Sequence, residues 1–175
     1  MAIIVAHNRK IIIQGITGNV GKMFVDRMLK FNPPLLGGVS PGKGGSQVEG
    51  LPVFDTVQEA VAELHADTSL IIVPARFVKG AVIEAVDAGI TTMVIYSEGV
   101  PVQDSVFFLE YAKLKGAKVF GPNSAGVFSP GEANLSDLQD DICNLKKGSV
   151  GIVSKSGTLT YEIIAIVTGQ GYGVS

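Results

Sequence analysis

The first residues that could do chemistry form the segment Gly15–Lys22, which reads GITGNVGK. It follows the apolar run Lys10–Gln14 and leads into an amphipathic segment. Where a strand ends in closely spaced glycines and a helix begins, free backbone amides and the helix dipole favour bound phosphate. The sequence therefore predicts a phosphate-binding loop here, and the question is whose phosphate it binds.

Two familiar phosphate loops fit this segment poorly. A nucleoside-triphosphate loop needs Gly15 one residue closer to Gly21, and it needs a hydroxyl where Met23 stands. A dinucleotide loop needs a tighter glycine spacing than that of Gly15, Gly18 and Gly21, and an acidic residue after the second strand to hold the ribose hydroxyls. That acidic residue is missing from the sequence.

Lys43 stands near the place where the acidic residue would be, in the segment Ser40–Lys43. An ammonium group attracts a phosphorylated ribose, whereas a carboxylate would repel it. With the amides of Thr17–Asn19 holding a pyrophosphate or sugar phosphate, the expected ligand is an adenine nucleotide with an extra ribose phosphate. CoA and NADP both meet this description.

Repeated strand and helix patterns must position these residues. Helices are expected where apolar residues recur at helical spacing and end at glycine or proline, and strands where short apolar runs stand between turn signals. The expected strands are Lys10–Gln14, Leu35–Val39, Pro52–Phe54, Ser69–Pro74, and the runs TTMVI and AKVF. The expected helices are Val20–Phe31, one capped by Asp55 or Thr56 with Glu59 in a capping box, Phe77–Ala88, and Ser105–Lys115. This alternation predicts an α/β fold, a Rossmann-like doubly wound parallel sheet.

The alternation stops at residue 125, and Ala125–Lys147 is expected to be irregular. A new strand is expected at Val150–Ser154, with a helix from about Thr158. Since one strand and one helix cannot enclose a core, we expect a first domain at 1–130, a linker at 131–148, and the opening unit of a second, truncated domain at 149–175. The exposed edge of the new strand predicts self-association or disorder of the last residues.

The overall composition narrows the class of protein. Hydrophobic residues make up 46% and charged residues 17%, which is typical of a globular protein. A net charge of −2 and no basic stripe argue against a nucleic-acid partner, and no apolar run is long enough to span a membrane. The single cysteine, Cys143, has no neighbours spaced for a metal site and fits a reducing compartment. The expected location is cytoplasmic, or the mitochondrial matrix if a presequence has been removed.

Six segments together resemble the α subunit of succinyl-CoA synthetase (succinate–CoA ligase) and related NDP-forming acyl-CoA ligases. They are QGITGNVGK, GGVSPGKGG, GLPVFDTVQEA, YSEGVP, GPNSAGVFSPGE and VGIVSKSGTLTYE, in that order from about residue 8 to the end. The resemblance implies a Rossmann-like domain that binds CoA and a following flavodoxin-like domain with a phosphorylated histidine. It also implies a β subunit that binds Mg-ATP or Mg-GTP, a small carboxylic acid as substrate, and a place in the tricarboxylic acid cycle.

The same resemblance implies roles for individual residues. Those implied to contact CoA are Thr17, Gly18, Asn19, Val20, Lys43, Tyr96, Ser97 and Glu98. Those implied to face the thiol, the acid or the phosphoryl group are Asn123, Ser124, Ser154, Ser156, Gly157, Thr158 and Tyr161. For the segment Ser154–Thr158 the physics agrees, since a helix N-terminus favours a phosphoryl group.

The chain departs from the family at three places. The usual GPNCPG is GPNSAG here, with Ser124 and Ala125, so succinate is not assumed as the acid. Asn19 and Val20 replace a common Ser-Gln pair. The only histidines, His7 and His65, stand before the first strand and at a helix end, so no phosphohistidine and no other catalytic residue is expected in this chain.

Two alternatives remain beside the ligase reading. One is a stand-alone sensor domain that binds CoA or a nucleotide without catalysis, although such a domain would be expected to finish its sheet. The other is an NADP-dependent reductase, which lacks an obvious proton donor near the loop.

Overall fold

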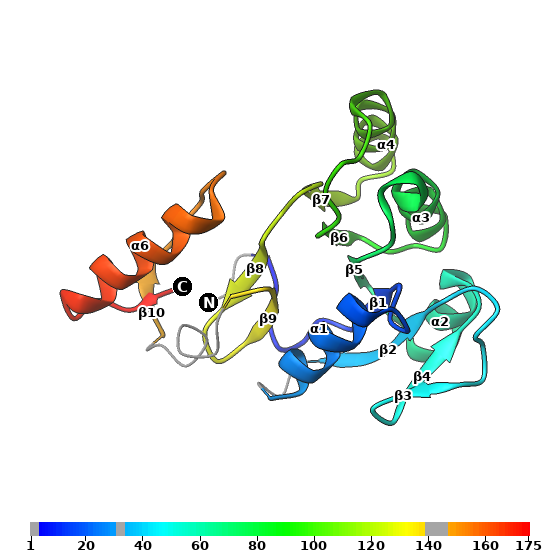
Figure 1. The fold of residues 1–175 in the computed structure, drawn as a ribbon, viewed down its shortest axis with the longest axis horizontal. Coiled ribbons are helices and arrows are strands. Elements are labelled where there is room, and N and C mark those ends of the chain that lie inside the picture. Colours follow the sequence, from blue (N-terminus) through cyan, green and yellow to red (C-terminus); the bar gives the residue numbers. More distant parts are fainter. Residues whose placement is uncertain (1–3, 31–33, 139–146) are drawn as a thin grey trace.

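The computed structural model describes residues 4–30, 34–138 and 147–175. Its main body is a seven-stranded sheet with strand order β3-β4-β2-β1-β5-β6-β7, parallel except for β3 (Figure 1). The strands are β1 (Ile11–Gln14), β2 (Leu35–Val39), β3 (Gln47–Val48), β4 (Leu51–Phe54), β5 (Thr68–Ile71), β6 (Thr92–Ile95) and β7 (Lys118–Phe120). This confirms the predicted Rossmann-like, doubly wound sheet.

The helices divide between the two faces of the sheet because the crossovers run in opposite directions from β1. Those of the main body are α1 (Asn19–Lys30), α2 (Val57–Leu64), α3 (Ala75–Asp87) and α4 (Val102–Leu114). The step from β1 to β2 carries α1, whereas the steps toward β5, β6 and β7 carry α2, α3 and α4. Right-handed crossovers therefore put α1 on one face and the other three on the opposite face.

Each face has its own apolar core. Beneath α2, α3 and α4 the core includes Val57, Val82 and Phe108, all fully buried. On the α1 face the core includes Phe24 from α1 and Leu135, which belongs to a separate two-stranded sheet. A face with a single crossover helix needs a second cover, and this small sheet provides it.

That small sheet consists of β8 (Gly126–Ser129) and β9 (Ala133–Ser136), paired antiparallel. All four residues of β9 are buried, and β9 packs beside α1. The expectation that residues 125–147 are irregular is therefore wrong for the hairpin. The remainder of the expected linker includes residues 139–146, and with them Cys143, which lie outside the described residues.

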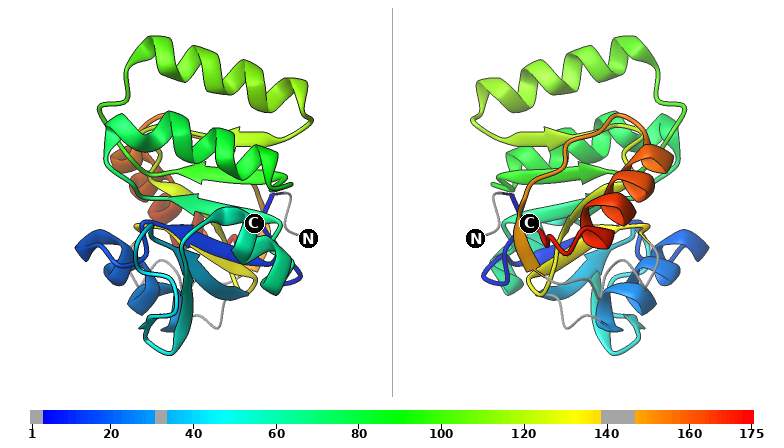
Figure 2. Two further views of the ribbon diagram at one scale, coloured as in Figure 1. Left: turned by 90° about the vertical axis from the view of Figure 1, so that its right-hand side faces the viewer. Right: turned by 90° about the vertical axis from the view of Figure 1, so that its left-hand side faces the viewer.

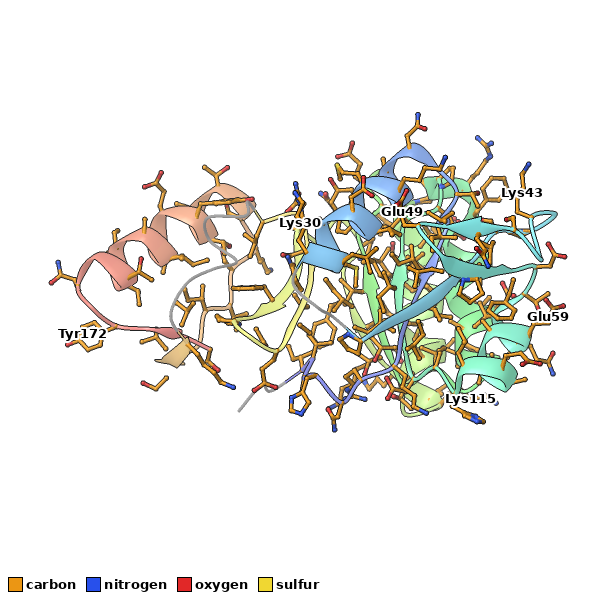
Figure 3. The ribbon with its side chains drawn as sticks, turned by 90° about the horizontal axis from the view of Figure 1, so that it is seen from below. Lys30, Lys43, Glu49, Glu59, Lys115 and Tyr172 are labelled. Atoms are coloured by element: carbon orange, nitrogen blue, oxygen red, sulfur yellow. The ribbon has the colours of Figure 1, made fainter. Side chains whose placement is uncertain are left out.

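The C-terminal unit lies beyond the hairpin, on the side away from the large sheet (Figures 1 and 3). It contains β10 (Lys147–Val150) and α6 (Gly157–Gly169). The expected strand at Val150–Ser154 is wrong in its bounds, because β10 spans Lys147–Val150, where Val174 bridges to Lys147 and Val150. Among the described residues, those directly after Val150 form no such bridge, and Val153 is fully exposed.

Helix α2 begins where its capping residues predict, whereas α3 and α4 begin at Ala75 and Val102, two and three residues before the expected Phe77 and Ser105. Thr56 is the N-cap of α2 and accepts a hydrogen bond from the Glu59 amide. The Glu59 carboxylate accepts from the Asp55 amide, one residue before the cap, so the capping box is displaced by one position. In the described part of the chain, no helix has the length and apolar character needed to cross a bilayer.

Candidate functional site

The carboxyl edge of the large sheet gathers most of the predicted contact residues. Thr17–Val20 follow β1, Lys43 follows β2, Tyr96–Glu98 follow β6, and Asn123 and Ser124 follow β7. These strands are parallel, so all four segments leave the sheet at the same edge. Adjacent strands lie about 4.8 Å apart, so the segments form a row across the sheet with β1 and β5 at its centre.

The loop after β1 is held in place by β2. The Thr17 hydroxyl donates to the Ser40 Oγ at 3.0 Å, and the Thr17 amide approaches the same oxygen at 3.4 Å. Ser40 is 5% exposed and directly follows β2. No local pattern in the sequence indicates this role for Ser40, because its partner lies 23 residues away along the chain.

Glycine is required where α1 meets this loop. A Cβ on Gly21 would overlap the Gly15 carbonyl oxygen and lie 2.7 Å from that of Ile16. Helix α1 begins at Asn19, so its first amides have no carbonyl partner within the helix. The close approach of loop and helix leaves those amides at the carboxyl edge, where an anion can accept from them.

Lys43 lies in a turn fixed from both sides. Its amide donates to the Ser40 carbonyl at 3.0 Å, and the next amide, that of Gly44, donates to the Asp55 carboxylate at 2.9 Å. The Lys43 side chain is exposed and points away from the ribbon (Figure 3). An exposed ammonium on a fixed backbone suits a phosphate contact at the rim of a site.

The segments after β6 and β7 are joined by backbone hydrogen bonds. The Asn123 amide donates to the Ser97 carbonyl at 2.9 Å, and the Ser124 amide donates to the Ile95 carbonyl at 3.2 Å. The Ser97 hydroxyl donates back to the Val73 carbonyl after β5. Glu98 is exposed beside them. The structure thus brings Ser97, Asn123 and Ser124 together.

Asp137 lies beside Tyr96 in a partly buried cluster that the sequence did not indicate. Burial raises the pKa of the Asp137 carboxyl, against the opposing effects of the Arg27 guanidinium and the Tyr96 hydroxyl. Burial also raises the pKa of Tyr96, and the carboxylates of Asp137 and Glu98 raise it further. The Tyr96 ring packs edge-on against Phe24, with centroids 4.9 Å apart. These contacts hold Tyr96 on the α1 face.

The N-terminus of α6 adjoins the row through Ala125 and Asp137. A Cβ on Gly157 would lie 3.7 Å from that of Ala125, and the Asp137 amide donates to the Ala125 carbonyl at 3.0 Å. The Tyr161 hydroxyl donates to the Asp137 carbonyl at 3.3 Å. Gly157 and Tyr161 therefore lie close to the segment after β7, although they belong to the C-terminal unit.

The start of α6 is itself capped by serine side chains. Ser156 is the N-cap and accepts from the Leu159 amide at 3.3 Å. The Ser154 hydroxyl accepts from the Ser156 amide at 3.1 Å, while Thr158 is exposed on the first turn. The predicted helix start near Thr158 is confirmed within one residue.

With this geometry in view, comparison with known proteins gives a direct result. The family model described as the CoA binding domain matches residues 6–99, just over half of the chain. The chain belongs to the CoA-binding domain family. The matched range contains the loop after β1, Lys43 and the segment Tyr96–Glu98.

Curated relatives extend the similarity of this CoA-binding domain to the whole chain. Succinate–CoA ligase [ADP-forming] subunit alpha 2 of Archaeoglobus fulgidus is 48% identical over 175 residues, all of this chain and 60% of that protein. The corresponding subunit alpha of Aquifex aeolicus is 46% identical over 177 residues, again all of this chain and 57% of that protein. The chain therefore spans about three fifths of the length of these relatives.

A solved structure supports the fold of the domain. ATP citrate lyase from Methanothrix soehngenii, in complex with citrate and coenzyme A, superposes with a TM-score of 0.83. The match covers 95% of this chain and 30% of that one at 22% identity. At this identity the likeness establishes the shared fold, including the C-terminal unit that the family model does not reach.

Proposed function

We propose that the chain binds CoA along the carboxyl edge of its sheet and serves as the CoA-binding part of an α subunit of a succinate–CoA-ligase-type enzyme. The observation that carries this is the 48% identity over the entire chain to such a subunit, joined to a domain family that binds CoA. The row of segments along the sheet edge supports it, since CoA is a long molecule with phosphates at one end and a thiol at the other.

The phosphate end of CoA fits the β2–β1 side of the row. The amides of Thr17, Gly18, Asn19 and Val20 would donate hydrogen bonds to the pyrophosphate at the start of α1. Lys43 would contact the phosphate on the ribose. Support comes from the Thr17–Ser40 contact and the fixed turn at Lys43, which hold these groups before any ligand arrives.

The thiol end of CoA fits the β6–β7 side. Tyr96, Ser97 and Glu98 would line the pantetheine arm, and Asn123 and Ser124 would lie at the thiol. The α6 start, Ser154–Thr158, would face a phosphoryl group, and Tyr161 would lie on the substrate side. The contact between Gly157 and Ala125 supports this, because it brings the α6 start next to the segment after β7.

In the complete enzyme, this part would work with groups that this chain does not contain. A histidine of a further domain would pass phosphate to a small carboxylic acid, and the CoA thiol would then attack the acyl phosphate to form the thioester and release inorganic phosphate. A β subunit would bind Mg-ATP or Mg-GTP. We place the enzyme in the cytoplasm or the mitochondrial matrix and in the tricarboxylic acid cycle, as the ligase assignment implies.

Isothermal titration calorimetry with CoA and with 3′-dephospho-CoA tests the proposal. We expect the chain to bind CoA more tightly, by about tenfold, because only CoA carries the phosphate that Lys43 contacts. Lys43→Ala should abolish that difference, and Lys115→Ala, at the far end of α4, serves as the matched control (Figure 3). Failure of the wild-type chain to bind CoA would refute the proposal.

Equal affinity for the two ligands would remove the role of Lys43 while leaving CoA binding itself intact. The stand-alone sensor has no observation in its favour here. It would gain one if the intact gene product ended at Ser175.

A further inference from the structure

The loop between β5 and α3 occupies the centre of the sheet edge, and none of the residues assigned above comes from it. β1 leads to β2 on one side, and β5 leads to β6 on the other, so the chain changes direction between β1 and β5 (Figure 1). In open α/β sheets, ligands bind outside the carboxyl ends of strands at such a point. Residues of this loop are therefore candidates for ligand contact.

This loop directly adjoins the phosphate-binding loop. A Cβ on Gly15 would lie 3.1 Å from the Ile72 carbonyl oxygen and 3.4 Å from a methyl group of Val73. α3 then begins at Ala75, after Pro74. Arg76 and Phe77 thus stand in the first turn of a helix that starts a few residues from the Gly15 contact.

The Arg76 and Phe77 side chains form a cation–π pair. The Arg76 guanidinium lies over the Phe77 ring, 4.6 Å from its centroid, and the ring is 53% exposed. Among residues 4–30, 34–138 and 147–175, no carboxylate forms an ion pair with Arg76. By contrast, Lys79 on the next turn pairs with Asp104 at 3.1 Å. Arg76 therefore keeps its charge and its donors for an external group.

A guanidinium held over an aromatic ring offers a planar, cationic group. Purine bases stack on aromatic rings and on guanidinium planes, and the guanidinium edge donates to phosphate oxygens. Arg76 and Lys43 leave the sheet on opposite sides of the loop after β1, and the ends of β2 and β5 are about 10 Å apart. Two long cationic side chains at that separation can both reach one nucleotide between them.

We propose that Arg76, supported by Phe77, contacts the adenosine 3′-phosphate portion of CoA by stacking on the adenine and donating to phosphate. This inference rests on the proposed function, since it takes CoA as the ligand. Arg76 would then help to determine specificity for the nucleotide half of CoA, and it would take no part in the reaction at the thiol.

Calorimetry with CoA and 4′-phosphopantetheine, which lacks the adenosine half, tests this assignment. Arg76→Ala should weaken CoA binding about tenfold and leave 4′-phosphopantetheine binding unchanged. Arg76→Lys keeps the charge but loses the plane, so it should recover only part of the loss. Phe77→Leu should weaken CoA binding severalfold by removing the support of the guanidinium.

Arg9→Ala is the matched control, because Arg9 precedes β1 at the opposite edge and lies near Asp67. Wild-type affinity for CoA in Arg76→Ala would overturn the inference, as would an equal loss for both ligands. If Lys43→Ala weakens CoA binding while Arg76→Ala does not, the proposed function stands and only this inference fails. If the wild-type chain binds no CoA, both fail.

Discussion

Helices α3 and α6 have the same length, 13 residues, but they use their apolar side chains in opposite ways. α3 buries Val78, Val82 and three other residues against the sheet, whereas α6 buries only Ile164. Leu159 and Ile166 of α6 are 57% and 65% exposed. In Figure 2, α6 lies on the outside of the molecule.

This difference separates what forms a helix from what stabilises it. The N-cap Ser156 marks the start of α6, just as the N-cap Thr56 marks the start of α2. In water, however, most helix stability comes from packing of an apolar face. In the main body, the helices bury an apolar face against the sheet. Within the described residues, α6 of the C-terminal unit buries only one side chain, that of Ile164.

The largest expected effect is a difference in the free energy of unfolding between substitutions in the main body and in α6. Leu70 in β5 is fully buried, so Leu70→Ala should lower the free energy of unfolding by about 3 kcal/mol through lost burial and a cavity. Ile166→Ala on α6 should change it by no more than about 0.5 kcal/mol, because the side chain is already exposed. Urea denaturation monitored by circular dichroism measures both. Comparable losses would show that α6 is packed as tightly as the sheet.

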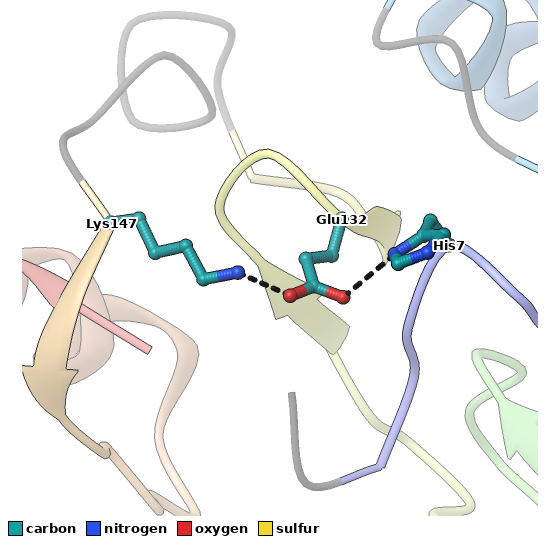
Figure 4. Close-up of polar contacts among 3 residues, drawn as sticks. All are labelled: His7, Glu132 and Lys147. Carbon is teal, nitrogen blue, oxygen red and sulfur yellow. Dashed lines mark hydrogen bonds and ion pairs between the residues drawn. The ribbon is translucent and has the colours of Figure 1, made fainter. Parts of the chain in front are cut away.

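The second expected effect concerns the connection between the two regions. Glu132 joins them, because its carboxylate accepts from Lys147 of β10 and from His7 of the N-terminal segment, the latter at 3.2 Å (Figure 4). These hydrogen bonds hold the pKa of Glu132 at about 2, below its ordinary value of 4.5. A lowered folded-state pKa gives stability that is present above pH 4.5 and is lost as the pH falls toward 2.

Glu132→Gln should therefore lower the melting temperature at pH 7 and reduce its fall between pH 4.5 and pH 2. Thermal scans across this range measure the effect, with Glu110→Gln on the exposed side of α4 as the control. An unchanged pH profile in Glu132→Gln would contradict the assigned contacts.

The smallest expected effect concerns Asp137, whose pKa is shifted in the direction opposite to that of Glu132. The pKa of Asp137 is raised, mainly by burial, so its ionisation opposes folding as the pH rises above the ordinary value of 3.8. Asp137→Asn should stabilise the chain at pH 7 by no more than about 0.5 kcal/mol, since the carboxyl is only partly buried and water screens it. At pH 3 the gain should vanish. A loss of stability at pH 7 would show that the contact with Arg27 outweighs burial.

The sequence predicted the central part of this molecule better than its margins. The strands β1, β2, β5 and β6 are short apolar runs that are buried on both faces, so their pattern is unambiguous. Strand β9, with the sequence ANLS, is also buried, but its burial comes from its packing beside α1 and in the core of the large sheet, and not from any apolar pattern. The predicted position of β10 is wrong for a similar reason. Its pairing depends on Val174, which is distant in sequence and bridges to Lys147 and Val150.

The candidate site shows the same division. The loop Gly15–Lys22 carries its own signal in glycine spacing, and Lys43 is predicted as a phosphate contact from its place after a predicted strand. Both ligand contacts stay predictions. Ser40 and Asp137 carry no local signal, because their roles depend on Thr17 and Tyr96, which are distant in sequence and adjacent only in the fold. The division into domains at 130 and 148 and the self-association of the chain stay predictions.

A crystal structure of the chain with bound CoA would show directly whether CoA lies along the carboxyl edge of the sheet. We expect the pyrophosphate on the amides of Thr17–Val20 and the ribose phosphate within hydrogen-bonding distance of the Lys43 ammonium. We also expect the thiol near Asn123 and Ser124, at the other end of the row. CoA bound elsewhere, with the loop after β1 and Lys43 both free of ligand, would contradict this placement.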